Sequence, residues 1–192
     1  VFEVSVHPQP TFHNFSDSMQ SARPRNVRML NLVGHANYRC GFFWLKDNKL
    51  EYEQVPMDRL VELIKTEAAG NGGTIELVVL GACETENLGR ELRKAGVPHV
   101  VCWRSEVQDA TAKRFVICFY KCLDQQDVEH RDYALAFQQA VARMESGQGA
   151  TRAGAKHRAA GAVDYVCFLS KSGDKFPPTG RILGLEGSDS SG

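Results

Sequence analysis

Two apolar runs, residues 27–33 and 74–82, constrain the fold of this chain more than any other feature. Their near-continuous apolar character is typical of strands that are buried on both faces of a parallel sheet. The first run ends abruptly at Gly34-His35, and the second leads straight into Cys83. His35 and Cys83 are therefore both predicted just beyond the carboxyl ends of buried strands.

The rest of the chain alternates predicted strands with predicted amphipathic helices. This alternation indicates an α/β fold with a mainly parallel sheet that is covered by helices on both faces. Residues 8–26 are polar and contain three prolines, so we expect a loop that includes a short helix. The other predicted strands are 1–7, 99–103 and 164–170, and residues 41–55 are predicted to form a hairpin that turns at 46–48. One helix is predicted after Pro56, with a stop at 70–73, and a second just before Gly96. Two further amphipathic helices are predicted over 109–123 and 132–146.

Size and charge limit the function classes. The 192 residues suffice for one domain with a sizeable core, which we place at 1–171, followed by a tail over 172–192 with a loose end. The 23 basic and 23 acidic residues balance to zero, which gives no support for binding nucleic acid or an anionic membrane. No apolar run has the length of a membrane span. The chain begins at Val1 without a methionine, so we expect it to be part of a longer protein.

The six cysteines form no CxxC pair, and their spacing to the histidines fits no zinc signature. No metal site is therefore expected. Several of these cysteines lie within apolar runs, which suggests reduced thiols in a cytosolic compartment rather than a disulfide scaffold. No glycine-rich phosphate-binding motif follows a predicted strand, so a nucleotide-binding domain is the least favoured interpretation.

Cys83 and His35 are the candidate catalytic residues. In open α/β sheets the ligand site lies beyond the carboxyl ends of the strands. If the strands at 27–33 and 74–82 are parallel neighbours, both side chains emerge at the same edge of the sheet. A helix that begins shortly after Cys83 would favour the thiolate. The backbone N–H groups of Cys83 and Ala36 are the natural donors to an oxyanion.

Each candidate residue also has a structural interpretation. A cysteine with apolar neighbours is most often an inert buried residue, and a lone histidine after a strand is most often structural. That interpretation suits Cys102, Cys118, Cys122 and Cys167. For Cys83 and His35, their joint placement at two strand ends favours catalysis.

Three segments of the sequence resemble CHAT domains. They are LNLVGHA (30–36), VVLGACET (78–85) and the stretch from Ala95 to Leu123. CHAT domains are caspase-like domains, often attached to tetratricopeptide repeats, and are related to separases, caspases and metacaspases. The resemblance implies a three-layer αβα sandwich and a cysteine endopeptidase that acts on polypeptides without a cofactor. It also implies a regulatory repeat domain as a partner, His35 as the catalytic histidine and Cys83 as the nucleophile, 48 positions apart (83 − 35).

The sequence departs from many CHAT domains around the nucleophile and after the third strand. Gly81 stands where the family commonly has serine, Glu86 stands where it has glycine, and the stretch from Cys102 to Asp109 is altered. That altered stretch is expected to wall the pocket for the P1 residue, the substrate residue before the scissile bond. The expected substrate-binding residues within it are Trp103, Arg104, Glu106 and Asp109.

Two specificities are compatible with these residues. Trp103-Arg104 resembles the stretch with which caspases hold an acidic side chain, whereas Asp109 matches the acidic position of relatives that cleave after basic residues. Because caspases have glutamine where Gly81 stands, we favour a weak preference for a basic P1 residue. The structural alternatives are core packing for Trp103, a solvated loop for Arg104 and Glu106, and a helix N-cap for Asp109.

Taken together, the sequence predicts a regulated cysteine endopeptidase with a Cys83–His35 dyad. The alternative hypothesis is a peptidase-like interaction module that binds partner proteins with little or no turnover. The altered loop after the third strand motivates this alternative, and the presence of both His35 and Cys83 argues against it.

Overall fold

The computed structural model describes residues 11–20, 22–37, 41–46, 51–127, 131–146 and 166–170, together with Val6 and Gly173. Its elements in chain order are α1 (Phe12–Gln20), β1 (Met29–Val33), β2 (Ala36–Asn37), β3 (Gly41–Leu45), β4 (Tyr52–Gln54), α2 (Met57–Lys65), a 3₁₀ turn (Ala69–Asn71), β5 (Leu77–Gly81), α3 (Glu86–Lys94), β6 (His99–Trp103), α4 (Asp109–Asp124), α5 (Tyr133–Glu145) and β7 (Val166–Ser170).

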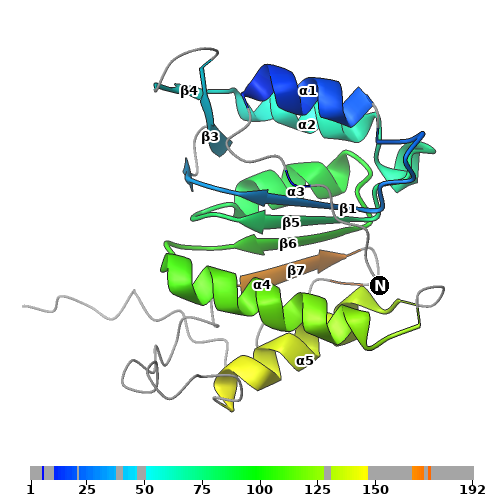
Figure 1. The fold of residues 1–192 in the computed structure, drawn as a ribbon, viewed down its shortest axis with the longest axis vertical. Helices are drawn as coiled ribbons and strands as arrows, with labels where there is room; N and C mark the ends of the chain where they lie inside the picture. Colours follow the sequence, from blue (N-terminus) through cyan, green and yellow to red (C-terminus); the bar gives the residue numbers. More distant parts are fainter. Residues whose placement is uncertain are drawn as a thin grey trace, which may run out of the picture.

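The central sheet has the strand order β1-β5-β6-β7 within the described residues (Figure 1). β1, β5 and β6 are parallel, and β7 pairs antiparallel with β6. This arrangement confirms the predicted α/β class with a mainly parallel sheet. It also confirms that the two apolar runs form neighbouring parallel strands, the condition on which the predicted site depends.

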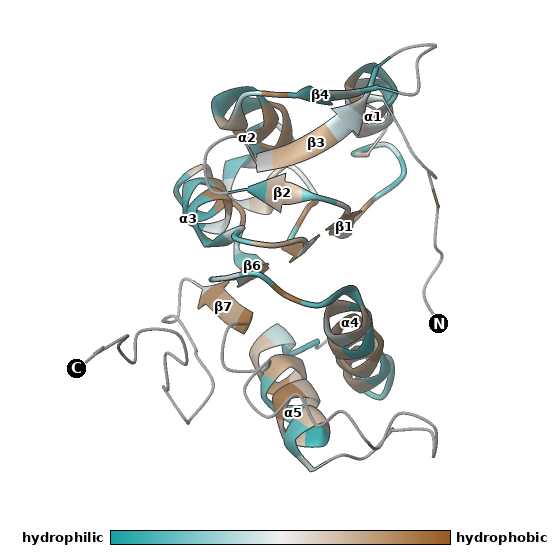
Figure 2. Ribbon diagram, turned by 90° about the vertical axis from the view of Figure 1, so that its left-hand side faces the viewer, coloured by the Kyte–Doolittle hydropathy of each residue, from teal (hydrophilic) through white to brown (hydrophobic). Residues whose placement is uncertain are grey.

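Side chains alternate between two cores along the inner strands. Val78 and Leu80 of β5 belong to the core beneath α1, α2 and α3, whereas Leu77 and Val79 belong to the core beneath α4 and α5. The same alternation continues through β6 and β7. Figure 2 shows α3 and α4 on opposite sides of β6 and β7. The molecule therefore has the three predicted layers, with the sheet in the middle.

β1 is less buried than its sequence predicts. Only Leu32 is fully buried, and Val33 is 73 % exposed. The prediction of burial on both faces was wrong because β1 stands at one edge of the described sheet. From β1, the core beneath α4 and α5 includes only the half-buried Met29. An apolar run identifies a strand, but it does not tell whether a helix covers that strand.

A smaller antiparallel sheet, β2-β3-β4, contains the predicted hairpin. β3 and β4 pair through Leu45↔Tyr52, and Lys46 N–H donates to the Glu51 carbonyl at 2.9 Å. The turn that was predicted at 46–48 lies almost wholly outside the described residues. α1 packs on this hairpin, because Phe12 and Phe15 both contact the Trp44 ring. α1 is the short helix that was expected within 8–26.

The glycine-rich stretch 70–73 does not end α2. The helix stops at Lys65 with Thr66 as its C-cap, five residues before Gly70. The glycines instead allow segments of backbone to approach each other closely. A Cβ on Gly73 would collide with the Glu67 backbone, and one on Gly70 with the Gly96 carbonyl.

The remaining predicted elements have mixed outcomes. The helices before Gly96, over 109–123 and over 132–146 are confirmed as α3, α4 and α5, and the strand 99–103 is confirmed as β6. The predicted strand at 1–7 and the tail at 172–192 lie almost wholly outside the described residues. Among the helices that the structure describes, none has the length and apolarity that crossing a bilayer requires.

Candidate active site

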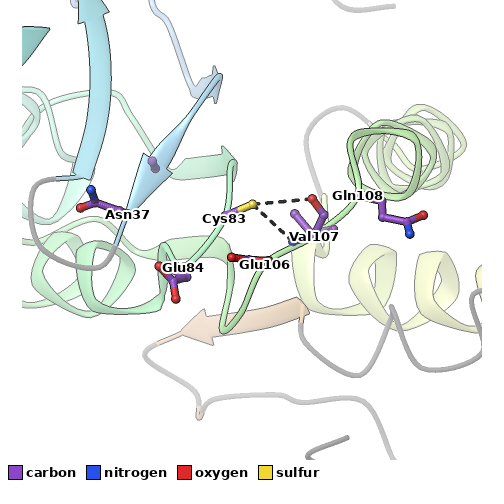
Figure 3. Close-up of a pocket in the computed structure, with 7 residues that line it drawn as sticks. Asn37, Cys83, Glu84, Glu106, Val107 and Gln108 are labelled. Carbon is purple, nitrogen blue, oxygen red and sulfur yellow. Dashed lines mark hydrogen bonds between the residues drawn. The ribbon is translucent and has the colours of Figure 1, made fainter. Parts of the chain in front are cut away.

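An open pocket of about 520 Å³ lies at the carboxyl end of β5. Its lining comes from β2, from the turn after β5 and from the loop that connects β6 to α4. Figure 3 shows the Cys83 sulfur directed toward Val107, with Asn37 on the other side of Cys83. The lining residues are Ala36, Asn37, Cys83, Glu84, Glu106, Val107 and Gln108.

The strand register places His35 and Cys83 at equivalent positions. The last paired residues of β1 and β5 are Val33 and Gly81, and His35 and Cys83 each follow two residues later. Both therefore leave the sheet at the same edge. Cys83 is half-buried in the pocket, whereas His35 is exposed and is not among the residues that line it. The imidazole of His35 makes no hydrogen bond to any residue that the structure describes.

The Cys83 sulfur has two contacts with the backbone of Val107. Val107 N–H donates to Sγ at 3.3 Å, and the thiol can donate to the Val107 carbonyl at 3.6 Å. The first contact offers a donor that a negatively charged sulfur can use, whereas the second needs the S–H proton. Val107 immediately precedes Gln108, the N-cap of the 16-residue helix α4. The sulfur thus lies close to the amino end of α4 as well as that of α3, which begins at Glu86.

The turn that carries Cys83 is tied to the loop after β6. Glu84 has φ = 52°, in the left-handed region, and its N–H donates to the Ser105 carbonyl at 3.1 Å. The next residue, Thr85, is 1 % exposed, and its hydroxyl oxygen accepts from Trp103 N–H at 3.1 Å. These contacts fix the two segments against each other within a few residues of the sulfur.

The N–H groups of Ala36 and Cys83, the two predicted oxyanion donors, take no part in pairing with a neighbouring described strand. Ala36 is opposite Phe42, but the hydrogen bond beside this pair runs from Phe43 N–H to the His35 carbonyl. Ala36 is therefore in a non-hydrogen-bonded pair, and its N–H points away from β3. In the described part of the chain, the N–H of Cys83 donates to no backbone carbonyl.

The four predicted substrate-binding residues take different places. Glu106 lines the pocket. Trp103 is buried against Phe115 beneath α4, as the packing alternative predicts. Arg104 lies outside the lining and donates from Nε to Glu86 at 3.1 Å. Asp109 is exposed in the first turn of α4.

The N-cap interpretation of Asp109 was wrong by one residue. Gln108 occupies the N-cap position of α4, and its side chain makes no capping hydrogen bond. Asp109 is the first helical residue, where its carboxylate interacts favourably with the helix dipole. Asp109 does not contribute to the pocket lining.

The CHAT domain family model matches residues 2–161 of the chain, which is most of its length. The chain belongs to the CHAT domain family. A search of curated proteins gave no match. Membership makes this a caspase-like, peptidase-related domain, and the family match covers every residue of the pocket described above.

The other described cysteines of the CHAT domain lie in the core, as their apolar neighbours predicted. Cys102, Cys118, Cys122 and Cys167 are all buried. A hydrogen bond with Cys167, together with burial, raises the pKa of Cys102 well above its usual value, which keeps this thiol protonated. His99 is structural too, since its ring stacks on Phe168 and burial lowers its pKa.

Sequence reasoning missed several residues of the site. Asn37 and Gln108 line the pocket, Val107 contacts the sulfur, and Thr85 joins the two loops. Val107 gave no signal because it acts through its backbone. Asn37 follows His35 by two residues, so its closeness to the candidate dyad was the one available signal. Among the described residues, no group of acidic, histidine or cysteine side chains could hold a metal ion.

Proposed function

We propose that this CHAT domain is a cysteine endopeptidase in which Cys83 is the nucleophile and His35 the general acid and base. One observation carries the proposal. The half-buried Cys83 lies in an open pocket, at the strand position equivalent to that of His35, and a peptide N–H points at its sulfur. Family membership supports a peptidase-related role but does not itself establish turnover.

The direction of the two side chains also supports a dyad. Leu30 and Leu32 of β1 face the core beneath α3, and so do Val78 and Leu80 of β5. If the alternation of a strand continues for two residues past each strand end, His35 and Cys83 both face the α4 side of the sheet. The contact between Cys83 and Val107, which leads into α4, agrees with this direction.

The reaction would proceed in two steps. The Cys83 thiolate attacks the scissile carbonyl carbon, and the oxyanion accepts hydrogen bonds from the N–H groups of Cys83 and Ala36. The C–N bond breaks as His35 protonates the leaving amine. Neutral His35 then takes a proton from water, whose oxygen attacks the thioester to release the carboxylic acid and the Cys83 thiolate. No cofactor takes part in this sequence.

A direct test is to incubate the full chain with peptide libraries and with peptidyl acyloxymethyl ketones that carry arginine or aspartate at P1. We expect peptide cleavage and a covalent adduct that mass spectrometry locates on Cys83. Cys83→Ala serves as the control for both readouts. The proposal fails if wild type and Cys83→Ala are equally inert toward every peptide and every probe.

The charges around the pocket support a basic P1 residue. Glu84 and Glu106 both line it, so two carboxylates are available to a lysine or arginine side chain. Arg104, on which an acidic preference would depend, is paired with Glu86 and lies outside the lining. This distribution favours a cationic substrate side chain over an anionic one.

We expect Glu106→Gln to lower kcat/KM for arginine-P1 peptides by about fivefold, because an exposed ion pair is worth about 1 kcal/mol. Cleavage of a peptide with a neutral P1 residue should change less than twofold. Rates on the two peptides, measured side by side at low and high salt, check this expectation. Glu145→Gln, at the exposed end of α5, is the matched control. An equal loss of kcat/KM on both peptides would show that Glu106 does not recognise the charge of the P1 side chain.

A binding module is the second candidate function, and one observation favours it. The sulfur of Cys83 has both of its hydrogen bonds with Val107, and none of the described residues links it to His35. A thiol held in this way would suit a pocket that binds a peptide without cleaving it. Tight binding of basic peptides by wild type and Cys83→Ala alike, without products or adducts, would support this function.

A further inference from the structure

We propose that Thr85 is a positioning residue for Cys83, which deepens the proposed peptidase function and rests on it. Its hydroxyl joins the turn that carries Cys83 to the end of β6, and the loop that leaves β6 there brings Val107 N–H onto the sulfur. Thr85 touches neither the sulfur nor the pocket. It acts through the backbone of another residue.

The Thr85 hydroxyl has two partners, both in the backbone. It accepts from Trp103 N–H at 3.1 Å and donates to the Ala82 carbonyl at 3.1 Å. Trp103 is the last residue of β6, and Ala82 directly precedes Cys83. Thr85 is 1 % exposed, so neither group could exchange this hydroxyl for bulk water. One oxygen atom therefore fixes the point where the loop leaves β6 relative to the nucleophile.

The loop that begins at this point is short. Only Arg104, Ser105 and Glu106 separate Trp103 from Val107, and the Ser105 carbonyl accepts from Glu84 N–H. A loop of three residues that is anchored at its base has little freedom to move its far end. The 3.3 Å contact of Val107 N–H with Sγ therefore depends on the anchor at Thr85.

The Thr85 hydroxyl does not serve to cap α3. Thr85 is the N-cap residue of α3, a position where threonine ordinarily accepts from the N–H two or three residues later. Its side chain makes no such bond, and the hydroxyl turns toward β6 instead. The threonine at this helix start thus serves the junction of the two loops.

The test measures the thiol itself rather than peptide cleavage. The Cys83 thiolate attacks the methylene carbon of iodoacetamide, so that an S–C bond forms, the C–I bond breaks and iodide leaves. Mass spectrometry quantifies the modified Cys83 peptide. We expect Thr85→Val to slow this alkylation roughly tenfold at pH 7, because the sulfur loses a well-placed donor to its charged form.

Thr85→Ser, which keeps the hydroxyl, should restore the rate to within about twofold of wild type. The matched control is Thr74→Val at the other end of β5, where a half-buried hydroxyl donates to the Val27 carbonyl at 2.9 Å. This control should be alkylated at the wild-type rate. A wild-type alkylation rate in folded Thr85→Val would overturn the proposal, and so would equal slowing by Thr74→Val.

A second variant covers the case in which Thr85→Val does not fold. Val107→Pro removes the donor N–H directly from the half-buried loop, and it should slow alkylation by a similar factor. An unchanged rate in folded Val107→Pro would also overturn the proposal. Because alkylation needs neither His35 nor a peptide, the absence of peptidase activity in wild type would leave this result interpretable.

Discussion

Replacement of His35 by glutamine is expected to lower kcat for peptide cleavage by roughly 10²- to 10⁴-fold, the usual contribution of a general acid and base. Glutamine keeps a polar side chain of similar length on an exposed position, so folding should be unaffected. It cannot carry a proton to the leaving amine or accept one from water. Steady-state kinetics on an arginine-P1 peptide measures the loss, and iodoacetamide alkylation of Cys83 should persist.

A control variant distinguishes a catalytic dyad from two residues that react independently of each other. His13→Gln is the matched control, because His13 is an exposed histidine on α1 whose partner is Asp17. It should leave kcat within about twofold of wild type. If His35→Gln retained the kcat of wild type while Cys83→Ala lost it, Cys83 would act with another base, and the assignment of His35 would be wrong.

Trp103→Ala is expected to lower the free energy of unfolding by roughly 3–5 kcal/mol, the usual cost of removing a large buried aromatic side chain. Trp103 is 1 % exposed and meets the Phe115 ring edge-on at 5.8 Å between centroids. Its loss would open a cavity between β6 and α4, directly behind the loop that reaches Cys83. Urea unfolding followed by circular dichroism gives the change.

Trp103→Phe provides the comparison for this prediction. Phenylalanine fills part of the same space, so the loss should be about 1–2 kcal/mol, and the preference for the P1 residue should not change. The opposite pattern would identify Trp103 as a wall of the substrate pocket. In that case Trp103→Ala would remain within about 1 kcal/mol of wild type and would alter the preference between arginine and aspartate.

The sequence predicted the parallel strands of the sheet well, because strand ends are marked by a change of residue type. Gly34 and His35 break one apolar run, and Cys83 breaks the other. Parallel pairing then places both ends at the same edge, and the register of β1 with β5 agrees. No local pattern encodes the order of the strands, and the sequence offered only the assumption that the strands at 27–33 and 74–82 are parallel neighbours.

The sequence failed where position relative to other elements decides the outcome. Val33 continues an apolar run yet is exposed, because β1 stands at the edge of the described sheet. Thr85 resembles an ordinary N-cap and Val107 an ordinary loop residue. Their roles depend on a contact between segments about 20 residues apart, which periodicity and spacing do not report.

The seven described residues that line the pocket all fall between Ala36 and Gln108 in the sequence. They belong to one uninterrupted stretch of polypeptide. β7 comes later in the chain and pairs with β6 on the side opposite to β5. The connection between α5 and β7 therefore follows, in the sequence, the stretch that carries these pocket residues. Insertions or exchanges of sequence in that connection would leave every pocket residue on the same continuous segment.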